Sequence, residues 1–258
     1  MARLLTFSNS RIVRRLLGRR KQQVSVGPVF TETLELPGEL RFLHRPGTHD
    51  PVIAMEVFTW KVYDRQFQLA PGNIVVDVGA HIGAYTIKAA REVSPSGLVI
   101  AVEPHEPNYQ ILLQNVRINN LKNVIPKRVA LLDFRGTSEL LVHRSNVGGH
   151  SMEPVFDEVD VAYRERVNVT TLDILCKELG ISRVDVLKID VEGGEAEVLR
   201  GAQSVLSERK IKIAAEVHRE KDELEAWLIL EHAGFQVKTL KIAESKYLYA
   251  WRSIQPSS

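Results

Sequence analysis

The chain is most tightly constrained by residues 74–83, where an apolar run leads directly into a glycine turn. Ile74–Val78 has the sequence Ile-Val-Val-Asp-Val, which is rich in the β-branched residues typical of a buried strand. Gly79 and Gly83 follow, and glycine lets the backbone take a positive φ and approach a ligand closely. The free N–H groups at the start of the next helix attract a carboxylate or phosphate. The pattern therefore predicts a strand, a tight turn and a helix that together bind a nucleotide-type cofactor.

Two acidic residues accompany this turn and narrow the choice of ligand. Glu103 ends the next apolar run, Leu98–Val102, where its carboxylate can accept both hydroxyls of a ribose. Asp77 lies just before the turn, where a carboxylate is unfavourable beside a pyrophosphate but suits the ammonium and sulfonium groups of S-adenosylmethionine. The dinucleotide pattern G-x-G-x-x-G is absent, because His81 stands between only two glycines. We therefore predict S-adenosylmethionine as the cofactor. NAD and a plain strand-turn-helix with packing glycines are the alternatives.

Strand and helix patterns alternate along residues 73–258, which we predict to form the cofactor-binding domain. The expected strands are 74–79, 98–103, 124–132, 184–190, 211–217, 235–240 and 246–252, with a hairpin formed by 138–142 and 167–169. The expected helices are 82–92, 107–119, 172–180, 195–206 and 221–233. Alternation of this kind, with continuously apolar strands, predicts a Rossmann-like α/β fold whose mostly parallel sheet is covered by helices on both faces.

Two further segments precede this domain. Residues 31–72 are predicted to form an N-terminal cap, with a hairpin at 31–45 and a mainly helical stretch at 52–69. Residues 1–30 form a basic extension, which carries seven of the 34 Lys and Arg residues and no acid, so that 27 basic and 32 acidic residues remain elsewhere. Contact with a membrane surface, binding to an anionic polymer and a plain solvated extension all remain open for it.

Composition excludes several classes of protein. With 44% hydrophobic and 26% charged residues, the 258-residue chain has ordinary globular usage. Its one cysteine, Cys176, allows no disulfide framework, and no Cys/His cluster has the spacing of a zinc site. No segment approaches the ~18 apolar residues of a membrane span, and the basic extension lacks the apolar run of a signal peptide. We therefore expect a cytoplasmic protein, and the sequence leaves its oligomeric state open.

A second acidic motif follows an apolar run near the middle of the expected sheet. Asp190 and Glu192 emerge at its carboxyl end, where open α/β sheets bind ligands, and Lys188 shares their row. His218 and Glu216 end the next strand at the same edge. We predict that Asp190, Glu192, His218 and Lys188 form a catalytic set at this edge. A structural ion pair of Lys188 with either carboxylate is the alternative. The carboxylates and His218 could also hold a divalent metal, but we predict no metal site.

Three other features have two interpretations each. Asp133 follows an apolar run and is predicted to approach the adenine, or else to be a turn residue. Glu195 is expected to open a helix and stabilise its dipole rather than to act in catalysis. The polar loop 145–151 is a candidate lid, and its His150 could reach the cofactor pocket or stay solvated.

Motifs distributed over residues 74–218 make the chain resemble the FkbM-type family of S-adenosylmethionine-dependent methyltransferases. They are Asp77–Thr86, Glu103-Pro104, Val169–Asp173, Leu187–Glu195 and Val198–Ala202. The segment K-I-D-x-E-G-x-E with a downstream L-x-G-A is the most specific of them. The resemblance implies a class I methyltransferase sheet of seven strands, the last one antiparallel, and a hydroxyl acceptor on a small molecule, glycan or lipid. We predict that Asp190, Glu192 or His218 orients or deprotonates this hydroxyl.

The motifs and the resemblance together assign the site residues. The predicted cofactor contacts are Asp77, Gly79, Ala80, His81, Gly83, Glu103, Pro104 and Asp133. The family's turn resembles G-A-N-I-G, and here His81 replaces the asparagine, so the local hydrogen bond to the methionine part of the cofactor differs, although imidazole can still donate or accept.

Two other functions remain as alternatives. An RNA or protein N-methyltransferase could use the basic residues 1–30 as an electrostatic footprint. Against it, the usual N-P-P-Y or D-P-P-Y motif is replaced by Ile189–Glu192, and an acidic row suits a neutral or cationic acceptor better than phosphates. A non-catalytic binding module that keeps the fold is the other alternative, but the motifs are too complete for a protein that has lost its catalytic activity.

Overall fold

A seven-stranded sheet forms the centre of the molecule. The computed structural model describes residues 30–144, 149–152, 160–208 and 210–252. The sheet order is β11-β12-β10-β9-β3-β4-β5, and β12 runs antiparallel to both of its neighbours. The strands are β3 (Ile74–Val78), β4 (Leu98–Val102), β5 (Val124–Lys127), β9 (Val186–Ile189), β10 (Lys212–Val217), β11 (Gln236–Ile242) and β12 (Ser245–Trp251). The predicted seven strands with an antiparallel last strand are therefore confirmed.

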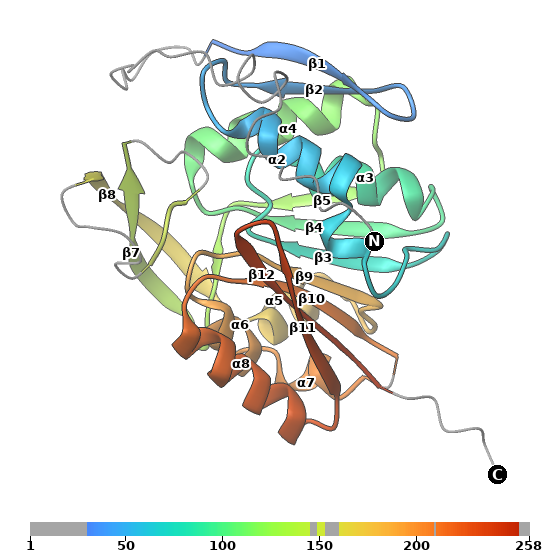
Figure 1. Cartoon of the computed structure of the whole chain (residues 1–258), viewed down its shortest axis with the longest axis vertical. Helices are drawn as coiled ribbons and strands as arrows, with labels where there is room; N and C mark the ends of the chain where they lie inside the picture. The colour runs from blue at the N-terminus through green and yellow to red at the C-terminus, as the bar shows by residue number, and fades with distance from the viewer. Residues whose placement is uncertain (1–29, 145–148, 153–159, 209, 253–258) are drawn as a thin grey trace, which may run out of the picture.

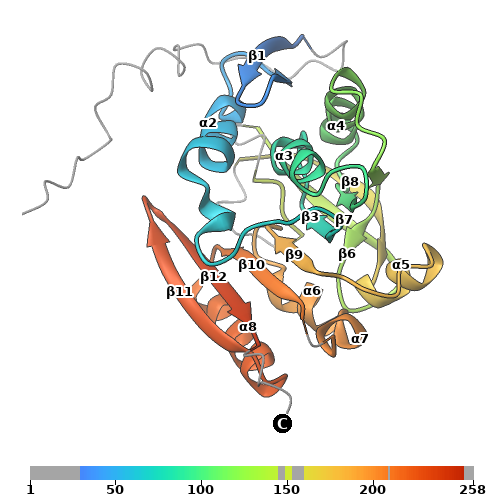
Figure 2. The ribbon, with the colours of Figure 1, turned by 90° about the vertical axis from the view of Figure 1, so that its right-hand side faces the viewer.

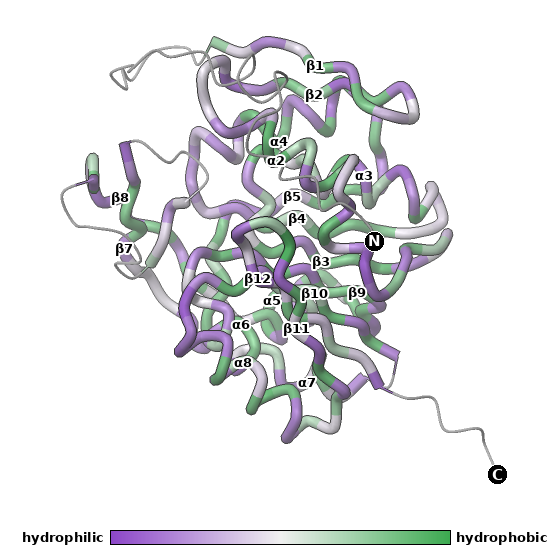
Figure 3. Tube along the Cα trace, viewed as in Figure 1, coloured by the Kyte–Doolittle hydropathy of each residue, from purple (hydrophilic) through white to green (hydrophobic). Residues whose placement is uncertain are grey.

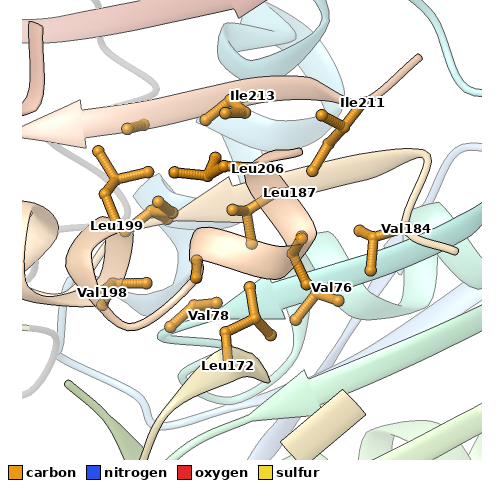
Figure 4. Close-up of a cluster of buried hydrophobic side chains, with 14 of the residues drawn as sticks. Val76, Val78, Leu172, Val184, Leu187, Val198, Leu199, Leu206, Ile211 and Ile213 are labelled. Atoms are coloured by element: carbon orange, nitrogen blue, oxygen red, sulfur yellow. The ribbon is translucent and has the colours of Figure 1, made fainter. Parts of the chain in front are cut away.

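Helices cover both faces of this sheet, as predicted (Figure 1). They are α3 (Ala84–Glu92), α4 (Glu106–Ile118), α5 (Leu172–Glu178), α6 (Glu195–Arg200), α7 (Gln203–Leu206) and α8 (Glu220–His232). Side chains of α3 and α4 pack on one face with Val75 and Val99, and α5 to α8 pack on the other with Val76 and Leu187 (Figure 4). Successive residues of β3 thus face opposite layers, which explains why the neighbouring residues Val75 and Val76 are both apolar.

The outermost helix of the second layer has a mixed surface. Along α8, both hydrophobic and hydrophilic residues occur (Figure 3), and Ala226 and Leu230 lie buried against the sheet. Among the described residues, no helix is both long and apolar enough to cross a membrane.

A separate three-stranded sheet corrects one predicted strand. The expected strand 124–132 is two strands, β5 in the main sheet and β6 (Ala130–Leu131) in a small sheet with β7 (Gly136–His143) and β8 (Val161–Thr170). Strand β5 is the edge of the main sheet and contains Pro126, which has no N–H to donate to a further strand. The predicted hairpin pairing of 138–142 with 167–169 is confirmed in part, because Ser138 pairs with Val167 in the antiparallel β7 and β8.

One predicted helix is also interrupted. The expected helix 195–206 is divided into α6 and α7 at Gly201 and Ala202. A Cβ atom at Gly201 would lie 2.1 Å from the carbonyl oxygen of Leu132, so the chain passes too close to the β6 segment for any side chain. The break therefore results from a tertiary contact that helical periodicity does not reveal.

The cap forms as a hairpin followed by short helices. The hairpin of β1 (Glu32–Leu36) and β2 (Leu40–His44) is confirmed, and the mainly helical stretch consists of α2 (Asp50–Met55), η2 (Glu56–Trp60) and η3 (Val62–Asp64). These elements run from the hairpin down to β10 and β12 (Figure 2), where the Tyr63 and Tyr247 rings meet edge-on at 5.7 Å. Residues 1–29 lie outside the described residues. The division at residues 30 and 72 stays a prediction.

Candidate active site

A cavity of about 200 Å³ opens at the carboxyl ends of the parallel strands. Its lining comes from the loops after β3, β4, β9 and β10, from the small sheet, and from the cap. This is the edge at which open α/β sheets bind their ligands. Of the predicted site residues, it is lined by Gly79, Ala80, His81, Glu103, Pro104, Lys188, Asp190, Glu192 and His218. The structure therefore brings both predicted motifs to one cavity.

The glycine turn approaches the second motif more closely than any side chain would allow. Gly79 has φ +73°, and a Cβ atom there would lie 1.7 Å from the carbonyl oxygen of Asp190. Gly83, with φ +94°, precedes α3 and packs on Leu112 outside the cavity lining. Glycine is thus required at position 79 by the contact between the two loops as well as by its positive φ.

Glu103 fixes the loops on the cofactor side. Its Oε2 accepts a hydrogen bond from the His81 amide and its Oε1 one from the His105 amide, both at 2.9 Å. The side chain is buried, and burial raises its pKa although these hydrogen bonds oppose the shift. Glu103 thus presents a fixed carboxyl group to the cavity beside the glycine turn.

His81 is tied to the cap. Its Nε2 lies 2.8 Å from Arg45 Nη2 and 3.6 Å from Asp50 Oδ1. Asp50 is fully buried and forms two further hydrogen bonds with the Arg45 guanidinium, each 2.9 Å long. The histidine that departs from the family's turn therefore has partners in the cap, and sequence reasoning missed Arg45 because no pattern connects the two segments.

Asp77 and Lys188 form a buried pair behind the cavity. They are direct partners in the register of β3 and β9, with Lys188 Nζ 3.1 Å from Asp77 Oδ1. The second Asp77 oxygen accepts a 2.6 Å hydrogen bond from Thr86, and Lys188 Nζ also donates to the Gly79 carbonyl at 2.7 Å. Burial opposes the charge of Lys188, but Asp77 and Asp190 outweigh it and raise its pKa. The structure does not bring Asp77 to the cavity lining, so it supports the turn through Lys188.

Asp133 is also placed away from the cavity. Its carboxylate is exposed and accepts a 3.2 Å hydrogen bond from Arg200 Nε on α6. Its neighbours Leu131 and Leu132 do line the cavity. The structure therefore favours the turn interpretation of Asp133, and two leucines occupy the wall where the adenine contact was predicted.

Carboxylates crowd the opposite wall. Tyr63 of the cap donates its hydroxyl to Asp190 at 2.9 Å and to Glu216 at 3.3 Å, so these two acids share one donor. Lys188 Nζ lies 3.6 Å from Asp190. Burial alone would raise the pKa of Asp190, but Lys188, His218 and Tyr63 outweigh it, so its pKa lies below the usual value. Asp190 is thus ionised at neutral pH.

His218 lies at the centre of this wall. Its Nδ1 is 3.0 Å from Glu195, and its Nε2 is 3.3 Å from Glu192 and 3.8 Å from Asp190. Burial disfavours the imidazolium, but these three acids outweigh it and raise the His218 pKa to about 10. Burial, with repulsion from Asp190 and Glu216, raises the pKa of Glu192 to about 8 despite the nearby ring. At neutral pH His218 is therefore charged, and Glu192 is a carboxyl group that titrates close to physiological pH.

The same wall has the spacing of a cation site. Asp190, Glu192 and His218 each offer one ligand atom, and these atoms lie within 4.8 Å of one another. No ion is needed to explain the arrangement, because each of the three side chains already has a charged neighbour. The expectation of a metal-free site stays a prediction.

Three cavity residues were missed or left open by sequence reasoning. Glu56 and Tyr63 come from the cap, where nothing in the local pattern indicates which side chains reach the sheet edge. His150 does line the cavity, and its ring meets His105 edge-on at 4.4 Å. The candidate lid is described only in part, because residues 145–148 lie outside the described residues.

Glu56 supports a prediction on stability. Burial, with repulsion from Glu216 and Asp190, raises its pKa from 4.5 to about 8. The folded chain thus retains a proton that the unfolded chain loses, so the stability contributed by this proton is complete below pH 4.5 and is lost as pH rises through 8. Glu56→Gln removes this loss. We expect its advantage over the parent in the free energy of unfolding to grow by on the order of 1 kcal/mol between pH 6 and pH 9, or about 2–4 °C in Tm.

Scanning calorimetry at the two pH values checks this expectation. Glu244→Gln is the matched control, because that carboxylate is almost fully exposed. A Glu56→Gln advantage that stays constant between pH 6 and pH 9 would contradict the assignment.

Comparison with known proteins agrees with this geometry. The family model described as the methyltransferase FkbM domain matches residues 77–237. The chain belongs to this methyltransferase family. It is 30% identical over 254 residues to the 31-O-demethyl-FK506 methyltransferase FkbM of Streptomyces tacrolimicus, covering 86% of this chain and 94% of that protein. It is 27% identical over 217 residues to methyltransferase sdnD of Sordaria araneosa, covering 72% of this chain and 82% of that protein.

A solved structure supports the fold of this FkbM-family chain. Methyltransferase FkbM from Methylobacillus flagellatus KT superposes with a TM-score of 0.56 at 21% identity, covering 74% of this chain. The aligned part spans 47% of that protein. The Rossmann-like methyltransferase fold predicted from the sequence is thus confirmed, and so is the resemblance to the FkbM family.

Proposed function

We propose that this FkbM-family methyltransferase uses S-adenosylmethionine to methylate a hydroxyl group of a small molecule, or of a glycan or lipid. The observation that carries the proposal is that one cavity is lined both by the glycine turn with Glu103 and by the acidic wall around His218. Glu103 would accept the ribose hydroxyls, while the turn at Gly79 to His81 would lie along the methionine part. The cofactor supplies an activated methyl group on its sulfonium.

The acidic wall would hold the acceptor and take its proton. S-adenosylmethionine would supply the methyl group, and its transfer to the acceptor oxygen would give a methyl ether, S-adenosylhomocysteine and one proton for the wall to take. Glu192 is the proposed base, because a carboxylate with a pKa of about 8 is matched to neutral or mildly alkaline conditions. The positive charge of His218, 3.3 Å away, orients Glu192, and Asp190 orients the acceptor hydroxyl.

The charge of the wall narrows the choice of acceptor. Glu56, Asp190, Glu192 and Glu216 all line the cavity, and among them only Asp190 lies beside a lysine. The described lining holds these carboxyl groups and one lysine, Lys188, and has no arginine to bind a phosphate, so the wall favours a neutral or cationic acceptor over RNA. The name of the Streptomyces relative specifies an O-linked position, which supports oxygen as the acceptor atom.

Two measurements test the function. Calorimetric titration and a thermal shift with S-adenosylmethionine test the cofactor: at 100 times Kd a ligand stabilises a protein by about 2.7 kcal/mol, or roughly 5–10 °C in Tm for a chain of this size. Transfer of a labelled methyl group to a cell extract, followed by identification of the product, tests the acceptor. Absence of both heat and a Tm shift would contradict the cofactor, and a product methylated on nitrogen would contradict the hydroxyl acceptor.

A further inference from the structure

We propose that Glu195 is a positioning residue, which acts by fixing the ring of His218 against the acidic wall. The proposal rests on the proposed function, in which His218 orients Glu192. It departs from the sequence expectation, which gave Glu195 only the role of a first-turn residue that stabilises the helix dipole. The structure separates these two roles because Glu195 and Glu197 both occupy the first turn of α6 in different surroundings.

The burial of Glu195 does not suit a dipole-stabilising residue. Its side chain is 0% exposed, whereas that of Glu197 is 28% exposed and pairs with Arg200 on the same helix. A carboxylate withdrawn from water is costly unless its oxygens receive hydrogen bonds. Glu197 is partly exposed, as residues that stabilise a helix dipole usually are. The complete burial of Glu195 therefore calls for another explanation.

The contacts of Glu195 supply that explanation. Its Oε1 accepts a 3.0 Å hydrogen bond from the Gly193 amide and lies 3.0 Å from His218 Nδ1. The Gly193 peptide is held from its other side, because Arg219 donates to the Gly193 carbonyl. One carboxylate oxygen thus ties the loop after β9 to the ring at the end of β10.

These contacts fix the proton on the ring. Glu195 Oε1 already accepts a hydrogen bond from the Gly193 amide, so the hydrogen between this oxygen and His218 Nδ1 belongs to the ring nitrogen. The Nε2 side is then directed at the remaining acids that face the ring, with Glu192 at 3.3 Å, Asp190 at 3.8 Å and Glu216 at 4.0 Å. Without Glu195, the ring could rotate about its side-chain torsions and leave Glu192 without its oriented neighbour.

The first experiment needs no activity. In the full-length chain labelled with ¹⁵N-histidine, the His218 signals are assigned by their loss in His218→Asn. We expect a protonated Nδ1 whose hydrogen resonates far downfield and exchanges slowly in the parent and in Glu197→Gln. In Glu195→Gln, that hydrogen should exchange at least ~10-fold faster. A parent in which His218 Nδ1 carries no proton, or a Glu195→Gln signal equal to that of the parent, would overturn the proposal.

The second experiment measures catalysis with labelled S-adenosylmethionine and the methyl-accepting fraction of a cell extract. Glu195→Gln should lower kcat about 10- to 100-fold without changing the KM for S-adenosylmethionine, because the altered group acts through another side chain. The double variant with His218→Asn should be no slower than His218→Asn alone. Additive losses would show that Glu195 does not act through His218. Failure of the parent to bind S-adenosylmethionine would refute the proposed function. The exchange rate of the His218 Nδ1 hydrogen would still show whether Glu195 positions the ring.

Discussion

Replacement of Glu103 with alanine is expected to weaken S-adenosylmethionine binding by about 100-fold or more. In our proposal both ribose hydroxyls donate to this carboxylate, and each hydrogen bond to a charged group contributes about 1.5–3 kcal/mol. Loss of about 3 kcal/mol corresponds to roughly a 100-fold change in Kd. The substitution also frees the amides of His81 and His105, which loosens the turn and adds to the loss. Calorimetric titration of each variant with the cofactor measures the effect.

The control for this prediction lies on the neighbouring helix. Glu106→Ala removes a carboxylate of α4 that is 38% exposed and pairs with Arg128 outside the cavity lining. We expect it to bind the cofactor as tightly as the parent. If Glu103→Ala also keeps the parent affinity while remaining folded, the ribose assignment is wrong.

The second large effect is expected at Glu192. Glu192→Gln removes the proposed base without changing the size of the side chain, and general-base catalysis typically contributes about 10²–10⁴-fold. We expect kcat to fall by about that factor while the Kd for S-adenosylmethionine stays within about twofold. In the parent, kcat should rise with pH as Glu192 loses its proton near pH 8, and this rise should be absent in the variant.

Two further variants show whether the effect is specific to the wall. Asp190→Asn should also lose turnover, because its carboxylate would orient the acceptor hydroxyl. Asp133→Asn should keep the parent rate, because its partner is Arg200 and it lies outside the cavity lining. Unchanged turnover in both Glu192→Gln and Asp190→Asn would leave only a structural ion pair at this wall.

Local sequence pattern predicted the central sheet well, for a physical reason. Buried parallel strands are continuously apolar, and the glycines and acids that follow them mark the ligand-binding edge. This is why Gly79, Glu103, Asp190 and Glu192 all lie at one cavity. The local pattern did not predict features that depend on contacts between distant segments. The helix break at Gly201 depends on the nearby Leu132 carbonyl, which the helical periodicity of the sequence does not reveal.

The roles of individual charged residues depended on the same kind of distant contact. Asp77 was predicted to contact the cofactor, but its strand register pairs it with Lys188, and the two charges neutralise each other behind the turn. Tyr63 and Glu56 could not be predicted as site residues, because their segment has no motif and reaches the cavity only through packing of the cap on β10 and β12. Side-chain partners that lie far apart in the chain are therefore the part that the sequence left undetermined.

The cavity is lined partly by loops of the central sheet and partly by the cap, so its two sides can change independently in evolution. The wall beside Glu103 is built from loops of the sheet, whereas Glu56 and Tyr63 of the opposite wall belong to residues 50–64 of the cap. In our proposal, substitutions at Glu56 and Tyr63 would reshape the part of the pocket that takes the acceptor, whereas Asp50 of the same segment supports the glycine turn through Arg45 and His81. If this proposal holds, exchange of residues 51–64 between two members of the family should change acceptor preference without changing the affinity for S-adenosylmethionine.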